Sequence, residues 1–135
     1  MGNGATFEIA AQNLGSYAGS LFKIDGTGTV ELDPHSTFKI SGDGTGAVTG
    51  IELGTGSIFT SDQPKEFTID LSANNSSGKA LIKNGAINFT RVKNTDVDKA
   101  SQVPLGEATV KYTNTGTLSS MKLTAEGRPA KTALK

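Results

Sequence analysis

The chain has 135 residues, with 13 basic and 13 acidic side chains and no cysteine. This length fits a single domain over residues 1–135, for which we expect mobile arms at residues 1–4 and 127–135. The formal net charge of zero argues against a nucleic-acid binder, which usually carries a basic excess. The missing cysteine excludes disulfides, thiolate metal sites and thiol nucleophiles. No apolar run approaches the length of about 20 residues that spans a bilayer, so we predict no membrane insertion.

Glycine is abundant, at 17 residues, and tryptophan is absent. Glycine is therefore about twice as frequent as its average of roughly 7%. Together with many serines and threonines and few charges, this composition is typical of short strands joined by tight turns. It predicts an all-β protein.

The opening residues 5–14 fit two patterns. Strand spacing fits Phe7 and Ile9, whereas helical spacing fits Phe7, Ala10 and Leu14. Because every neighbouring segment predicts a strand, we expect a strand here as well.

The stretch from Leu21 to Ile40 shows the clearest alternation of apolar and polar residues. Two polar interruptions, residues 25–28 and 33–36, divide it into three runs and carry the Gly, Pro and Asp residues that tight turns use. Each run has one apolar and one polar face. We predict an antiparallel meander.

The next segments are weaker. Residues 47–53 predict a strand with Gly50 as a bulge site, and residues 57–61 a short edge strand. Residues 65–73 return to clean alternation. Around Asn84-Gly85, a dipeptide favoured at type I′ hairpin turns, residues 80–92 predict two strands.

From residue 94 to residue 106 the alternation stops, and we expect an irregular stretch with one helical turn near residues 96–100. Two final strands are predicted, one around Ala108 to Tyr112 and one around Met121 to Ala125, joined by a turn.

These elements predict a single antiparallel β-sandwich or barrel of about eight to ten short strands with Gly-rich turns. A Gly-Thr-Gly triplet begins at Gly26, Gly44 and Gly54, but without a fixed period, so we predict no repeat architecture. The apolar faces predict a core of Phe22, Ile24, Val30, Leu32, Phe38, Ile40, Phe67, Ile69, Leu71, Phe89, Val110 and Leu123.

The residue types that catalysis needs are scarce. The one histidine, His35, lies between Pro34 and Ser36 in a predicted turn, where we expect it to be solvated. An enzyme would have to rely on carboxylates alone; the candidates are Glu52, Asp62, Glu66 and Asp70. We therefore predict no enzyme, no catalytic residues and no cofactor.

Metal and sugar sites also lack a clear signal. Asp25 and Asp43 stand in Gly-rich loops and Asp96 and Asp98 are spaced by two, but no EF-hand pattern is present, so we expect plain turn carboxylates and no metal. The aromatic residues left for stacking on a glycan are Tyr17, Phe59 and Tyr112, and the glycosylation pattern occurs at Asn74 and Asn88.

These observations favour a non-enzymatic structural protein, such as a virion decoration or tail protein or a surface filament subunit. It would act by self-association or by attachment to a shell, with copies of itself or other structural subunits as partners. The alternative is a glycan- or surface-binding β-sandwich module. The chain has a general likeness to cysteine-free subunits of surface fibres, without a shared motif.

The start, Met1-Gly2-Asn3-Gly4, has neither a basic nor an apolar region, so no signal peptide is predicted. We expect the protein at the extracellular surface or on a virion. We also expect that at least one terminal arm contacts another subunit. Deleting residues 1–14 or 128–135 should then weaken assembly and leave the core melting transition largely intact.

Overall fold

The computed structural model describes residues 2–94, 109–112 and 119–125, with the backbone alone for residues 93–94 and 109–112. The described residues form strands and turns and contain no helix, which confirms an all-β protein. This part of the chain therefore holds no helix that could cross a membrane.

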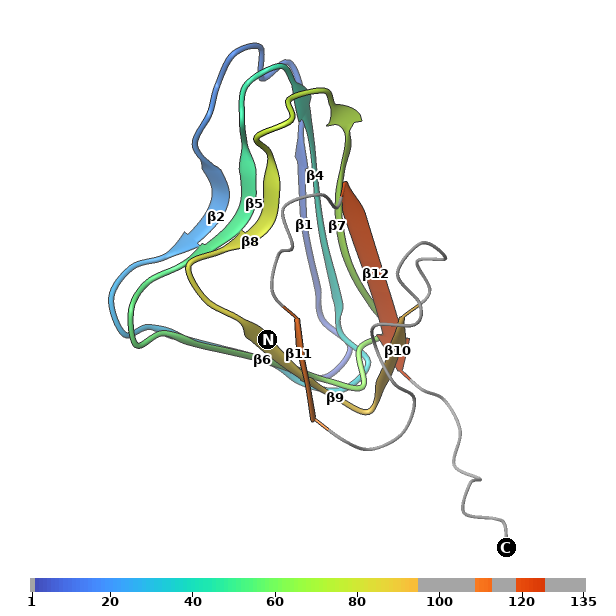
Figure 1. The fold of residues 1–135 in the computed structure, drawn as a ribbon. Coiled ribbons are helices and arrows are strands. Elements are labelled where there is room, and N and C mark those ends of the chain that lie inside the picture. The colour runs from blue at the N-terminus through green and yellow to red at the C-terminus, as the bar shows by residue number, and fades with distance from the viewer. Residues whose placement is uncertain (1, 95–108, 113–118, 126–135) are drawn as a thin grey trace, which may run out of the picture.

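The strands form three sheets that enclose a roughly triangular interior (Figure 1). Sheet A contains, in spatial order, β1 (Thr6–Ala11), β4 (Thr37–Gly44), β7 (Glu66–Asn74), β12 (Ser120–Ala125) and β10 (Val92–Asn94). Sheet B contains β2 (Ser20–Ile24), β5 (Thr49–Leu53) and β8 (Ala80–Lys83). Sheet C contains β3 (Thr29–Leu32), β6 (Ile58–Asp62), β9 (Ile87–Thr90) and β11 (Thr109–Tyr112).

The chain visits sheets A, B and C in turn and then starts the next coil, so that strands from successive coils pair in parallel. Thr6 pairs with Thr37, 31 residues later, and Thr60 pairs with Asn88, 28 residues later. One coil thus takes about 30 residues. This arrangement is a β-solenoid, in which each coil contacts only its neighbours.

The prediction of a single antiparallel sandwich or barrel is therefore wrong, because the strands lie in three sheets and are mostly parallel. The prediction that the chain has no repeat architecture is also wrong. Short strands separated by four-residue turns are typical of hairpins, but here each turn bends the chain into the next sheet instead of reversing it. At the predicted hairpin turn, Asn84 has φ +68° and Gly85 is not in the positive-φ region. A type I′ turn needs positive φ at both central residues, so β8 and β9 part into different sheets.

The corner between sheets C and A repeats at a fixed interval. His35, Gln63 and Arg91 follow one another by 28 residues and have φ of +66°, +46° and +54°. The backbone N–H of His35 donates to the carbonyl of Gln63, and that of Gln63 donates to the carbonyl of Thr90. Because none of these corner residues is glycine, the glycine spacing concealed the period.

β12 and β11 run against the solenoid strands that they join, whereas β10 runs in the same direction as β7. β12 pairs antiparallel with β7, β10 pairs antiparallel with β12, and β11 pairs antiparallel with β9. These strands extend sheets A and C beyond the third coil, while sheet B ends at β8 in the part of the chain that the structure describes. The predicted helical turn at residues 96–100 lies outside the described residues.

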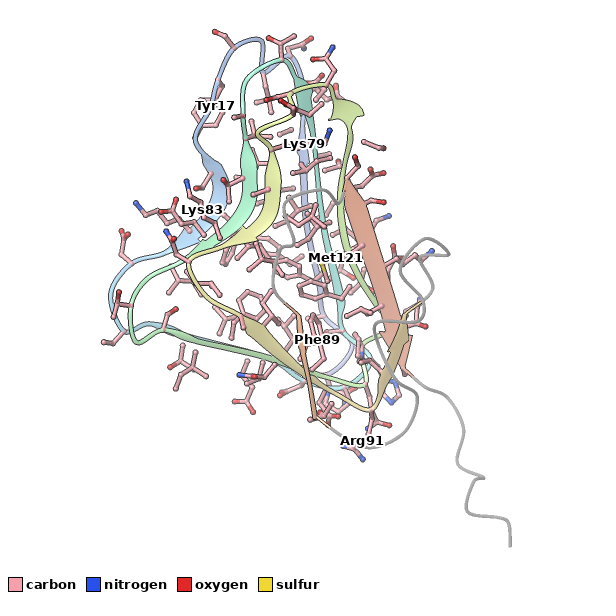
Figure 2. The ribbon with its side chains drawn as sticks, viewed as in Figure 1. Tyr17, Lys79, Lys83, Phe89, Arg91 and Met121 are labelled. Carbon is pink, nitrogen blue, oxygen red and sulfur yellow. The ribbon has the colours of Figure 1, made fainter. Side chains whose placement is uncertain are left out.

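The core lies inside the three sheets, and Figure 2 shows Phe89 and Met121 pointing into it. Of the twelve predicted core residues nine are buried, Phe22 and Val30 are partly buried, and the side chain of Val110 lies outside the described residues. The prediction missed several buried apolar residues: Val48, Ile51, Leu53, Phe59, Leu81, Ile82, Ile87, Val92 and Met121.

Two local predictions are also wrong. Residues 57–61 were expected at an edge, but β6 lies between β3 and β9 inside sheet C. Gly50 is no bulge, since β5 keeps its register with β2 and β8 across it. A Cβ at Gly50 would lie 2.7 Å from the carbonyl oxygen of Leu81 and from Cγ2 of Ile69, so glycine is needed there for close packing.

Candidate interaction sites

One end of the solenoid is formed by β1, β2 and β3, each of which is the outermost strand of its sheet. We call this surface, the first coil with its outward-facing strand edges, the open end. Each of these strands pairs on one side only within the described chain. Strand edges of this kind are templates for pairing with another chain.

The interior side chains of the open end are incompletely covered. Six partly buried apolar residues pack against the core from the first coil and its turns: Phe7, Ile9, Leu14, Leu21, Phe22 and Val30. Their counterparts one coil further in, such as Phe38 and Ile40, are 2% and 1% exposed. The difference is the missing coil on their outer side. The open end therefore combines unpaired strand edges with accessible apolar surface.

Charged residues stand on the outer faces of the same three strands. Glu8 on β1, Lys23 on β2 and Glu31 on β3 are all exposed. The Nζ atom of Lys23 lies 3.6 Å from Oδ1 of Asp25. The order around the open end is thus acidic, basic, acidic.

The segment before Gly15 is part of this end and not a separable arm. β1 pairs with β4 over six residues, and the ring of Phe7 contacts those of Phe22 and Phe38. The strand interpretation of residues 5–14 is confirmed. The expectation that deleting residues 1–14 spares the core is not supported, because the deletion removes a strand of sheet A. Residues 127–135 lie outside the described residues.

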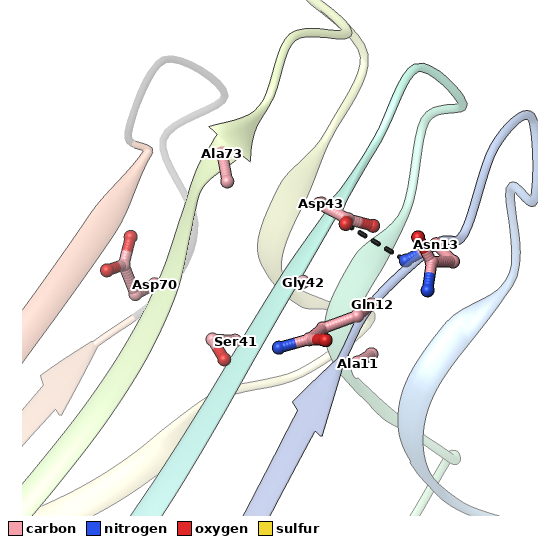
Figure 3. Close-up of a pocket in the computed structure, with 8 residues that line it drawn as sticks. All are labelled: Ala11, Gln12, Asn13, Ser41, Gly42, Asp43, Asp70 and Ala73. Carbon is pink, nitrogen blue, oxygen red and sulfur yellow. Dashed lines mark hydrogen bonds between the residues drawn. The ribbon is translucent and has the colours of Figure 1, made fainter.

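The outer face of sheet A carries two adjoining shallow hollows of about 290 and 380 Å³. Figure 3 shows the first; it is lined by Ala11, Gln12, Asn13, Ser41, Gly42, Asp43, Asp70 and Ala73. The second is lined by Glu8, Lys39, Ile40, Ser41, Glu66, Thr68, Asp70 and Lys122. Ser41 and Asp70 belong to both, so the hollows form one polar surface without aromatic side chains.

Asp43 is fixed at the rim of the first hollow. Its carboxylate accepts hydrogen bonds from the backbone N–H group of Asn13 at 2.9 Å (Figure 3) and from that of Leu14 at 3.0 Å. These bonds hold the pKa of Asp43 below its usual value, because they favour the charged form. Asp43 thus ties the loop after β1 to the second coil.

The residues considered for calcium do not converge. Asp43 is committed to backbone donors, Asp25 lies beside Lys23, and Asp96 and Asp98 lie outside the described residues. Over residues 2–94, 109–112 and 119–125, His, Asp and Glu side chains form no group of three suited to a metal ion.

The catalytic candidates are spread over the three sheets. Glu52 on sheet B accepts a hydrogen bond from Ser20 Oγ, which lowers the pKa of Glu52. Burial raises the pKa of Asp62 on sheet C, but hydrogen bonds from Arg91 and Thr90 outweigh it and the net shift is downward.

Glu66 and Asp70 share the outer face of β7, where Thr68 and Ser72 hydrogen-bond to them. His35 is exposed at its corner, as expected.

The sugar-binding candidates are reduced to one described residue. Phe59 is only 1% exposed, so its assignment to the surface was wrong; it belongs to the core. Tyr17 is 48% exposed, and its hydroxyl donates to the carbonyl oxygen of Ser20 at 3.1 Å. The side chain of Tyr112 lies outside the described residues. Asn74 is buried and donates to the carbonyl oxygens of Asp43 and Gly46, which leaves its amide inaccessible for glycosylation.

Comparison with protein-family models, with curated proteins and with solved structures found no match to this chain. The open end and the polar surface of sheet A are therefore assigned from their geometry and chemistry alone.

Proposed function

We propose that this chain is a non-enzymatic structural protein, of a virion or of a cell surface, that associates with copies of itself through the open end of its solenoid. The observation that carries the proposal is the coincidence of three strand edges with six partly buried apolar residues on one surface. Apolar patches and strand edges of this kind mark association sites, and main-chain hydrogen bonds supply much of the affinity.

The described side chains also favour a structural role over catalysis. The candidate carboxylates are spread over the three sheets, with Glu66 and Asp70 together on β7, and all are engaged with neighbouring hydroxyl, amide or guanidinium groups. His35, the only histidine, is exposed at a corner of the solenoid. A general base needs a positioned partner and a substrate cavity. Glu66 and Asp70 line only the shallow hollows on the outer face of sheet A, and they accept hydrogen bonds from the hydroxyl groups of Thr68 and Ser72.

The test compares two substitutions of isoleucine by lysine. Ile9 lies at the open end, whereas Ile58 is 50% exposed on the outer face of β6 and serves as the control. We expect light scattering over a concentration series to show association of the wild-type chain and weaker association of the Ile9→Lys variant. The Ile58→Lys variant should associate like the wild type. A wild-type chain that stays monomeric at every concentration would overturn the proposal.

A glycan- or surface-binding module is the second candidate, and the polar hollows on sheet A favour it. Hydroxyl, amide and carboxylate groups there suit sugar hydroxyls, although stacking aromatics are absent from the lining. Binding to a glycan array that is lost in Ser41→Arg and kept in Thr60→Arg, on the outer face of sheet C, would support this function. Without binding by the wild-type chain the candidate fails.

A further inference from the structure

The two ends of the solenoid have different shapes. At the open end the outermost strands of all three sheets come from one coil. At the other end, counting residues 2–94, 109–112 and 119–125, sheet B stops at β8 after three strands, sheet C at β11 after four and sheet A at β10 after five. Since neighbouring strands lie about 4.8 Å apart, the described end of sheet A projects about 10 Å further than that of sheet B. If the open end of one copy approached the described stepped end of another, strands could therefore pair in only one of the three sheets at a time.

Two open ends fit each other better. A two-fold axis perpendicular to the solenoid axis reverses the direction in which the chain runs around the solenoid, so the first coils of two copies meet antiparallel. All three outer strands of each copy then find a partner at once. We infer that the partner of the open end is a second copy of this chain in a head-to-head, two-fold dimer. This inference rests on the proposed function and names the partner at the same site.

Charge restricts where the two-fold axis can lie. An axis through sheet B would pair β2 with its own copy and β1 with β3, which places Lys23 near Lys23 and Glu8 near Glu31. Like charges on facing strands are destabilising. An axis through sheet A places Lys23 opposite Glu31 of the other copy, and an axis through sheet C places it opposite Glu8. Both remaining arrangements contain two pairs of Lys23 with a carboxylate of the other copy. Each also pairs one strand with its own copy and brings two glutamates onto facing strands, Glu8 in the first and Glu31 in the second, so pairs of opposite charge outnumber pairs of like charge.

The apolar residues agree with these registers. With Lys23 opposite Glu31, the inward-facing Phe22 and Ile24 stand opposite Leu32 and Val30 of the other copy. In this register opposite charges face each other on the outer surface and apolar side chains face each other in the interior. When one face of a sheet is buried, its hydrophobic pattern favours such a register.

With Lys23 opposite Glu8, Phe22 and Ile24 stand opposite Ile9 and Phe7. The dimer is closed, because the same surface serves both copies and none remains at the open end for a third.

Charge reversal tests the inference. The Lys23→Glu variant should raise the dimer dissociation constant by about tenfold, since two symmetric contacts turn from attraction to repulsion. Adding either Glu8→Lys or Glu31→Lys to it should restore dimerisation, and the one that does so identifies the axis. The control is Lys83→Glu, which lies in the same row of sheet B two coils away and should not affect the dimer. Melting temperatures measured in parallel separate association from folding.

The result expected is a wild-type mass of two chains at saturation. Filaments or larger wild-type assemblies would overturn the head-to-head dimer, as would an unchanged dimer in Lys23→Glu or rescue by neither second substitution. Each of these outcomes still leaves association intact. A wild-type chain that never associates would instead contradict the proposed function itself.

Discussion

The ring of Phe38 lies flat against the ring of Phe67, with centroids 4.9 Å apart and planes 7° from parallel. On its other side, Phe38 stacks on Phe7 at 4.9 Å and 11°. The three residues occupy the same register position in successive coils of sheet A. Phe22 and Phe59 meet Phe38 edge-on from the other sheets. The ladder thus links three coils and places Phe38 at its centre.

Replacing Phe38 by alanine should therefore destabilise the fold strongly. We expect the free energy of unfolding to fall by about 3–5 kcal/mol, because a buried ring is lost and its cavity cannot close between two stacked neighbours. Phe7→Ala should cost less, since Phe7 is only partly buried. Urea unfolding measures both changes. A loss below about 1 kcal/mol for Phe38→Ala would show that the ring contributes little to the core.

Ser61 should be dispensable for stability. Its side chain is 1% exposed, faces the core between Leu32 and Phe89, and its hydroxyl has no hydrogen-bond partner. A buried hydroxyl without a partner costs about 1–3 kcal/mol of desolvation, and alanine avoids that cost. We expect Ser61→Ala to raise the melting temperature. A lower melting temperature would mean that the hydroxyl is hydrogen-bonded inside the protein.

The stability of the fold should depend on the charge of Asp43. Hydrogen bonds from the backbone of Leu14 and Asn13 lower its folded-state pKa. Such a carboxyl stabilises the fold above its unfolded pKa of about 3.9, and this contribution is lost as the pH falls through the folded-state pKa. At about pH 7 the Asp43→Asn variant should be less stable than the wild type. This difference in the free energy of unfolding should narrow below about pH 4. Urea unfolding curves at several pH values measure it, and a difference that stays constant with pH would contradict the prediction.

A chelator should leave the melting temperature unchanged. Asp43 uses its oxygens on backbone N–H groups and Asp25 lies beside Lys23, so neither has a coordination sphere to lose. Differential scanning calorimetry with and without EDTA checks this expectation. A drop in melting temperature that added calcium reverses would instead identify a calcium site in the protein.

The alternation of residues predicted most strands and their inward faces correctly. Ile40, Phe67 and Ile69 were assigned to the core and are buried, because alternation reports which side of a strand faces apolar surroundings. Alternation does not report which strands pair with each other in a sheet. Parallel and antiparallel pairing therefore looked alike, and short turns favoured the wrong choice.

The period was concealed by the chemistry of the corners. His35, Gln63 and Arg91 all adopt positive φ at the same corner, although their side chains are unrelated. The glycines of the Gly-Thr-Gly triplets lie instead at two different corners. Gly44 ends a strand of sheet A, while Gly26 and Gly54 lie between sheets B and C. The open end was unpredictable for a related reason. Ile9 and Leu14 are incompletely covered only because the first coil has no further coil stacked on its outer side.

The repeated corner makes the coil a unit in which this chain can lengthen. A tandem duplication of residues 37–65 would add one strand to each sheet, and the new corner would again follow by about 29 residues, close to the spacing of the present ones. Insertion of a single residue into β4 would instead turn every later side chain of that strand to the opposite face. Genetic change can therefore extend the solenoid by whole coils while both of its ends keep their present structure.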